Sequence, residues 1–170
     1  MAQLELKSAE FRREREQSWI ELDRLVAKAE KKAVSSRSGM KLTRNTSPYH
    51  DAWIAQTERD LDAALEALSN ADFERLAEIV EGSCLAMHAD AMAARPGIIY
   101  FKSPTLWAID KVRALRKNGT PVMFTIDAGP HVVAFTPPEH LKTVTAALSE
   151  HPEIDRVIES GMGDGASLTS

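Results

Sequence analysis

Two short apolar runs, residues 121–124 and 132–135, are separated by a segment that contains Gly129-Pro130. Short apolar runs bounded by turn-forming residues predict two strands joined by a tight connection. The first run leads into Asp127, so its carboxylate is expected at the lip of a sheet, beside apolar neighbours. We therefore expect the rest of the chain to be organised around this hairpin.

Asp127 is the first candidate for chemistry. Burial raises the pKa of a carboxylate unless a cation or backbone N–H groups offset it, and enzymes prepare general acids and bases in this way. An Asp shortly before Gly-Pro is also ordinary turn chemistry. The local sequence leaves both interpretations of Asp127 open.

Composition indicates one folded domain. The 170 residues are 44% apolar and 27% charged, with a net charge of −4. There is no basic stripe interleaved with aromatic residues, so we expect no nucleic-acid partner. There is no apolar run of membrane-spanning length, and early glutamates argue against a signal peptide. The single Cys84 excludes an intrachain disulfide, and a cytoplasmic location is expected.

Hydrophobic periodicity predicts helices packed on one face of a small antiparallel sheet, which is the α+β class. Asp72 is expected to cap the third helix and Asn118-Gly119 to end the fourth. The expected helices cover residues 7–32, 48–69, 73–94, 105–117 and 138–148, and the expected short strands cover residues 98–101, 121–124, 132–135 and 154–158.

Apolar stripes predict which helix faces are buried. The second helix is expected to bury Trp53, Ile54, Leu61, Leu65 and Leu68, and the fourth Leu106, Ile109, Val112 and Leu115.

His88 and Cys84 are spaced by one helical turn in the third helix. No set of His, Cys and Asp at ligand spacing accompanies His88, so a core residue is favoured over a metal ligand. The spacing would allow a thiol–imidazole pair, but no third group orients it, and both residues are interpreted as packing.

A polar segment, residues 31–40, is predicted to be a loop. Ser35, Ser36 and Arg37 bring together hydroxyls, backbone N–H groups and a guanidinium, which are the groups that bind phosphate or carboxylate oxygens. The alternative is a flexible polar linker. Ser47-Pro48 is then expected to begin the next helix.

Four motifs occur in a familiar order and spacing: Val34-Ser35-Ser36-Arg37-Ser38-Gly39-Met40, Thr46-Ser47-Pro48, Met87-His88-Ala89 and Asp127-Ala128-Gly129-Pro130. Together they resemble the C-terminal half of the diphosphomevalonate decarboxylases, which belong to the GHMP kinase superfamily. The resemblance runs from about residue 29 to about residue 166. It implies the superfamily's C-terminal fold, a ferredoxin-like two-layer sandwich, for a domain covering residues 29–170. Residues 1–28 do not resemble the family.

The resemblance implies an ATP- and magnesium-dependent reaction of isoprenoid synthesis, in the mevalonate pathway. Mevalonate 5-diphosphate is phosphorylated on its tertiary hydroxyl, and loss of that phosphate with carbon dioxide gives isopentenyl diphosphate. Asp127 matches the family's aspartate beside the substrate hydroxyl. Ser35, Ser36 and Arg37 match the residues that face the diphosphate. Here His131 follows Asp-Ala-Gly-Pro where the family usually has Asn, which puts the hydrogen bonding beside Asp127 in doubt.

The family's ATP-binding half carries a motif of the form Pro-x-x-x-Gly-Leu-x-Ser-Ser-x-Ser, and nothing in these 170 residues resembles it. One carboxylate and one Arg do not supply the cations that phosphoryl transfer needs. We therefore expect a substrate-binding part that is inactive alone, binds no cofactor itself, and depends on an ATP-binding half for Mg-ATP. The alternative is a non-catalytic interaction domain, possible as a homodimer through the apolar stripe of residues 11–29, including Trp19.

Overall fold

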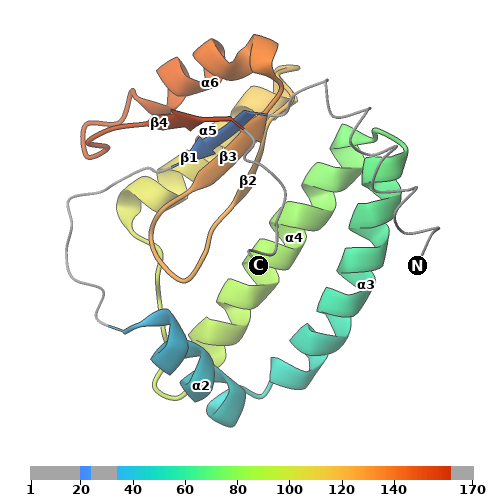
Figure 1. Ribbon diagram of the computed structural model, residues 1–170. Helices are drawn as coiled ribbons and strands as arrows, with labels where there is room; N and C mark the ends of the chain where they lie inside the picture. The colour runs from blue at the N-terminus through green and yellow to red at the C-terminus, as the bar shows by residue number, and fades with distance from the viewer. Residues whose placement is uncertain (1–19, 24–33, 162–170) are drawn as a thin grey trace, which may run out of the picture.

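The computed structural model describes residues 20–23 and 34–161. Four strands form one antiparallel sheet in the order β2-β3-β1-β4. The strands are β1 (Ile20–Asp23), β2 (Met123–Thr125), β3 (Val133–Thr136) and β4 (Ile158–Ser160). The helices are α2 (Ser36–Thr46), α3 (His50–Ser69), α4 (Phe73–Ala93), α5 (Ser103–Lys117) and α6 (Leu141–Leu148), the last preceded by the 3-10 turn η1 (Pro138–His140). Helices gather around this small sheet (Figure 1), and the α+β class is confirmed.

The predicted hairpin is present. β2 and β3 pair antiparallel, with Phe124 opposite Ala134 and Met123 opposite Phe135. Phe124 and Ala134 share the face of the sheet that α5 and α6 cover, where Val112 of α5 and Val144 of α6 are fully buried with them. Met123 lies on the other face and packs with residues of α3 and α4. The alternation of side chains along a strand explains why neighbouring residues enter different clusters.

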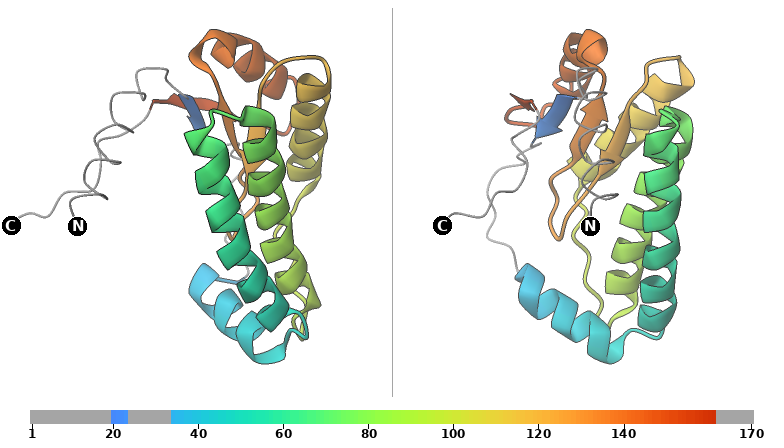
Figure 2. Two further views of the ribbon diagram at one scale, coloured as in Figure 1. Left: turned by 90° about the vertical axis from the view of Figure 1, so that its right-hand side faces the viewer. Right: turned by 45° about the vertical axis from the view of Figure 1, so that its right-hand side comes forward.

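The α3–α4 hairpin confirms the predicted helix pair. The two helices lie side by side (Figures 1 and 2), and Asp72 caps α4 by accepting the Arg75 amide at 3.0 Å. The predicted apolar face of α3 is largely wrong, because Leu61 and Leu65 are 60% and 51% exposed. Ile54 and Leu68 are exposed as well. Small residues, with Ala67 buried and Ala63 and Ala64 partly so, face α4 instead and allow a close approach of the helices.

The end of α5 is confirmed, since Asn118 is its C-cap and Gly119 takes the left-handed conformation at φ 88°. Leu106 of the same helix was predicted to be buried and is 52% exposed. Near the helix start, the buried positions are Pro104, Thr105 and Ala108, because this side of α5 faces the sheet core and the β2–β3 connection.

The predicted helix over residues 7–32 is wrong at residues 20–23, which form β1 between β3 and β4. Backbone pairing on both sides outweighs the helical spacing of the apolar residues. The other residues of that prediction, 7–19 and 24–32, lie outside the described residues.

Two strand predictions need correction. Residues 98–101 form no strand of the sheet, and Ile98 and Tyr100 bury their side chains with Ala91 of α4 instead. The last strand was predicted at residues 154–158 and is β4, Ile158–Ser160, since that is where the chain pairs with β1.

β2 is an edge strand, and its outward backbone groups are met by side chains of α4 and α5. The Phe124 amide donates to Glu81 at 3.4 Å, and Arg116 donates at 2.8 Å to the carbonyl of Val122, the residue just before β2. Arg116 also forms a two-pronged ion pair with Glu81, with N–O distances of 2.5 and 2.9 Å. An edge covered in this way cannot pair with another strand.

In the described part of the chain, none of the helices is both long enough and apolar enough to cross a membrane.

Candidate functional site

Asp127 lies in the connection between β2 and β3, two residues after β2 ends. Its side chain is exposed, while Ile126 before it and Gly129 after it are buried. The Gly129 amide donates to the Asp127 carbonyl at 2.6 Å, which closes a tight turn. The expected place at the lip of the sheet is therefore seen, but the expected burial of the carboxylate is not, because the turn directs it outward.

The peptide group before Asp127 is held from α4. His88 Nε2 lies 3.1 Å from the Ile126 carbonyl oxygen, and Cys84 Sγ lies 3.6 Å from the same oxygen. Because a carbonyl only accepts, Nε2 of His88 carries the hydrogen. His88 and Cys84 are thus both buried, as predicted, and they share one acceptor.

The other end of the turn is held from α5. Thr105 Oγ1 donates to the Pro130 carbonyl at 2.8 Å and accepts the Lys102 amide at 3.1 Å. The segment with Asp127 is therefore tied to two different helices. The contact of Thr105 with the turn was not predicted from the sequence, because a threonine near a helix start indicates only a capping residue.

The predicted anion-binding loop is the start of a helix. Ser35 is the N-cap of α2, and its Oγ accepts the Ser38 amide at 3.2 Å. Ser36 and Arg37 occupy the first turn, and all three side chains are exposed. The loop prediction was wrong from residue 36 onward, where α2 begins. Gly39 and the serines have low helix propensity, which favoured a loop, but Ser35 caps a helix at this point. Ser47 ends this helix rather than beginning the next.

The structure brings the start of α2 and the Asp127 turn to one apolar cluster. Ala91, Ile98 and Tyr100 form its buried centre, and Val34 and Ala128 pack against it. Val34 directly precedes Ser35, and Ala128 directly follows Asp127. Figure 1 shows the β2–β3 connection reaching toward α2. The two groups of predicted site residues are thus next in sequence to residues that pack against the same cluster.

Close packing fixes α2 against this cluster. A Cβ built on the buried Gly39 would fall within van der Waals overlap of the Tyr100 hydroxyl. Only a residue without a side chain allows the helix to approach Tyr100 so closely.

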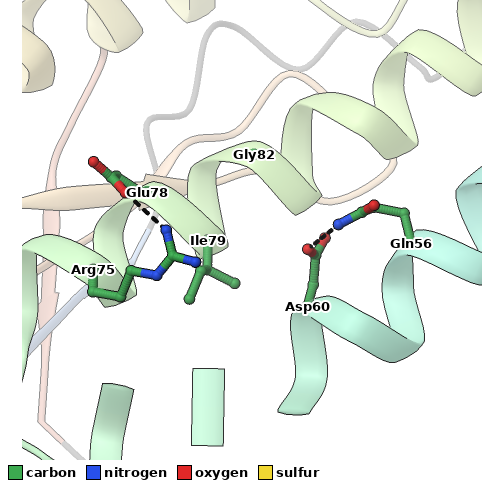
Figure 3. Close-up of a pocket in the computed structure, with 6 residues that line it drawn as sticks. All are labelled: Gln56, Asp60, Arg75, Glu78, Ile79 and Gly82. Carbon is green, nitrogen blue, oxygen red and sulfur yellow. Dashed lines mark hydrogen bonds and ion pairs between the residues drawn. The ribbon is translucent and has the colours of Figure 1, made fainter. Parts of the chain in front are cut away.

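A separate hollow lies between α3 and α4 (Figure 3), lined by Gln56, Asp60, Arg75, Glu78, Ile79 and Gly82. Its polar side chains already pair with one another: Gln56 donates to Asp60 at 2.6 Å, and Arg75 donates to Glu78 at 3.1 Å. None of the predicted site residues lines it. Within residues 20–23 and 34–161, no group of three or more His, Cys, Asp or Glu residues is arranged to hold a metal ion.

His88 predicts a pH dependence of stability. Burial lowers the pKa of His88, and the hydrogen bond to Ile126 and the charge of Asp127 oppose this only in part. The unfolded chain therefore binds the proton first, near pH 6.5, and stability should fall from about pH 6.5 down to the lowered pKa. His88→Gln should reduce this slope by up to about 1.4 kcal/mol per pH unit.

Urea unfolding at several pH values between 7.5 and 5 measures the slope. His140→Gln, which changes a partly buried histidine at the end of η1, outside the β2–β3 turn, serves as the matched control. A slope that His88→Gln leaves unchanged would contradict the assignment of a neutral, buried His88.

Comparisons with known proteins agree with the motifs. Residues 24–166 match the family model described as the mevalonate 5-diphosphate decarboxylase C-terminal domain. A diphosphomevalonate decarboxylase of Ganoderma lucidum is 29% identical over 133 residues, which is 74% of this chain and 33% of that protein. The chain thus spans about a third of the length of this curated relative.

Solved structures share the fold. The mevalonate pyrophosphate decarboxylase of Streptococcus pyogenes has a TM-score of 0.80 and 33% identity, over 89% of this chain and 47% of that one. A further structure, in complex with MVAPP, AMPPCP and magnesium, has a TM-score of 0.77 and 36% identity, over 86% of this chain and 44% of that one. The fold predicted from the resemblance, that of the GHMP C-terminal domain, is confirmed. With its four motifs in register and residues 24–166 matching the family's domain, the chain belongs to the mevalonate 5-diphosphate decarboxylase family and represents its C-terminal domain.

Proposed function

We propose that this chain is the substrate-side part of an ATP-dependent diphosphomevalonate decarboxylase, which converts mevalonate 5-diphosphate to isopentenyl diphosphate, carbon dioxide, ADP and phosphate. One structural observation supports the proposal in addition to family membership. The start of α2, with Ser35, Ser36 and Arg37, and the turn with Asp127 meet at one apolar cluster. A substrate with a diphosphate at one end and a hydroxyl at its centre would need both groups of residues on one side of the molecule.

The diphosphate is assigned to the start of α2. Backbone N–H groups in the first turn of a helix point outward and carry partial positive charge, so they favour anions. Ser35 and Ser36 add hydroxyls, and the exposed Arg37 adds a guanidinium that can hold two phosphate oxygens. The helix has no acidic residue in its first turn to oppose an anion.

Asp127 is assigned to the tertiary hydroxyl. Its carboxylate is exposed on a turn that two helices hold, so it can accept or orient the hydroxyl proton without first breaking a buried contact. A carboxylate that orients or deprotonates the attacking hydroxyl is a known part of phosphoryl transfer.

Mg-ATP is assigned to a separate part of the enzyme. Transfer of the phosphoryl group depends on several cations placed around the phosphates. Arg37 and Asp127 cannot supply them, so we infer that residues 29–170 are inactive alone and act with an ATP-binding half, on the same or another polypeptide. A structure of a relative in complex with MVAPP, AMPPCP and magnesium supports Mg-ATP as the cofactor of the full enzyme. The alternative, a non-catalytic domain that dimerises through residues 11–29, rests mainly on residues outside those described.

Calorimetric titration of the chain with mevalonate 5-diphosphate, with and without Mg-ATP, tests the proposal. Arg37→Ala should weaken binding by about 10- to 150-fold, the value of a charge-assisted hydrogen bond. Arg44→Ala, which removes an exposed arginine from the last turn of the same helix, is the matched control and should change binding by less than about 3-fold. Mevalonate 5-phosphate, which lacks the outer phosphate, should bind more weakly than the diphosphate.

Absence of binding by the folded chain at millimolar ligand, with and without Mg-ATP, would rule out a substrate-binding role for this domain. Equal losses for Arg37→Ala and Arg44→Ala would show that only the overall charge of α2 matters, and that Arg37 does not hold the diphosphate.

A further inference from the structure

Three polar side chains of α4 form a buried stripe that covers the outer edge of the sheet at β2 and at Ile126, just after it. Glu81, Cys84 and His88 follow one another at spacings of three and four, which places them on one face of the helix. They are 4%, 6% and 1% exposed. Glu81 accepts the Phe124 amide, while Cys84 and His88 approach the Ile126 carbonyl. This stripe takes the place of a further strand at the edge of the sheet.

The last contact of the stripe falls on the peptide group that carries Asp127. The carbonyl of Ile126 and the amide of Asp127 belong to one planar unit. Holding the Ile126 oxygen therefore fixes the plane that contains the Asp127 amide and Cα. With that plane held, the direction in which the Asp127 side chain leaves the backbone varies only by rotation about the Asp127 N–Cα bond.

The surroundings keep the hydrogen on the Cys84 thiol and limit the orientations of the His88 ring. Burial raises the pKa of the Cys84 thiol, so its hydrogen stays on sulfur at neutral pH. The ring of His88 contacts the rings of Phe101, at a centroid distance of 4.4 Å, and Tyr100, at 5.9 Å. These rings restrict the rotation of His88, so Nε2 remains directed at the Ile126 oxygen.

We propose that His88 is a positioning residue for Asp127, acting through the Ile126 carbonyl. Cys84 supplies a second, weaker contact to the same oxygen, and Thr105 holds the far end of the turn at Pro130. His88 does not touch the substrate in this assignment. The proposal that His88 positions the Asp127 peptide is based on the contacts above. The proposed effect on catalysis rests on the function proposed for Asp127.

The geometric part is tested by NMR on the full chain. His88→Leu removes the donor and keeps an apolar side chain, while His88→Gln places an amide N–H near the position of Nε2. The Asp127 amide resonance should move, and the Gly129 amide should exchange faster, in His88→Leu, and both should return toward wild type in His88→Gln. Leu76→Ala, a buried substitution near the start of α4 in the cluster that contains Ala67 and Met123 rather than Ile126, controls for general destabilisation and should leave both amides unchanged.

A measurement on the wild-type protein covers the case in which His88→Leu does not fold. The ¹⁵N shifts of the His88 ring at pH 7.5 report which nitrogen carries the hydrogen. The Nε2–H form is expected. The Nδ1–H form would overturn the proposal, because Nε2 could then not donate to the carbonyl.

The catalytic consequence is measured with the full chain joined to the ATP-binding half of the Streptococcus pyogenes relative. His88→Leu should lower kcat by about 10- to 100-fold with little change in KM, because misplacing a reacting group costs that much while the diphosphate is held by α2. His88→Gln should recover most of the loss. Equal losses in His88→Leu, His88→Gln and Leu76→Ala would reduce His88 to a structural residue and overturn the proposal.

The two proposals fail in different ways. If wild-type chain binds no diphosphate, the proposed function fails, while the NMR comparison still decides whether His88 sets the Asp127 peptide. If His88→Leu leaves the Asp127 amide unmoved in a folded protein that binds substrate, the positioning role fails and the proposed function stands.

Discussion

Arg116→Ala is expected to lower the free energy of unfolding by about 3–5 kcal/mol, the cost of leaving a buried charge without its partner. Glu81 is 4% exposed, and both of its oxygens are bound by Arg116, at 2.5 and 2.9 Å. The same guanidinium donates to the Val122 carbonyl, so its loss also leaves a backbone group of the β2 edge without this donor. Urea unfolding at pH 7 measures the effect.

Two further variants test whether the loss comes from the unpaired buried charge of Glu81. Lys111→Ala removes the more exposed ion pair with Glu150, whose N–O distance is 2.6 Å, and should cost no more than about 1 kcal/mol. The double variant Glu81→Met with Arg116→Met removes both charges, and its loss should be well below the sum of the single losses. Arg113 lies 3.7 Å from Glu81 and is about half exposed, so it offers only partial compensation. If Arg116→Ala lowers the free energy of unfolding by less than about 1 kcal/mol, the Arg116–Glu81 ion pair does not stabilise the β2 edge as expected.

Asp127→Asn is expected to lower kcat by about 10²- to 10⁴-fold in the full chain joined to the ATP-binding half of the Streptococcus pyogenes relative, the usual contribution of a group that accepts a proton. The amide keeps the size of the carboxylate and removes its basicity and charge. Because the Asp127 side chain is exposed, the free energy of unfolding should change by less than about 0.5 kcal/mol. Diphosphate binding, measured by calorimetry, should persist, since it is assigned to α2.

Asp155→Asn is the matched control for this prediction, because Asp155 is also exposed and lies outside the β2–β3 turn. It should leave kcat unchanged. Full turnover by Asp127→Asn would remove Asp127 from the reaction, and a matching loss of diphosphate binding would assign it to substrate binding instead.

Local chemistry was enough to predict several features. The β2–β3 hairpin follows from two short apolar runs around Gly129-Pro130, and the structure shows it in that place. Asp72 marks the start of α4 because its side-chain oxygen can cap a helix, and Gly119 marks the end of α5 because glycine readily adopts a left-handed φ. Both are properties of single residues, so the sequence shows them. The family could be recognised from four short motifs in order, since their spacing is carried by the sequence itself. The roles of Asp127, Ser35, Ser36 and Arg37 remain predictions until binding and turnover are measured.

Features that depend on a distant partner could not be predicted. Residues 20–23 form a strand because β3 and β4 lie on either side of them, although their spacing suggested a helix. Leu61 and Leu65 are exposed because alanines of α3, not its leucines, face α4.

Short-range features could be predicted from the residues alone: the turn, the helix caps and the motifs that place the chain in its family. The role of the buried polar residues of α4 depends instead on how the helix packs. Glu81, Cys84 and His88 looked like scattered polar or packing residues along a helix, and their partners lie 38 to 43 residues away, on β2 and at Ile126. Hydrogen bonds over such separations exist only once the helix is packed against the strand edge. The backbone groups left open at that edge are the physical reason that these side chains are polar and buried.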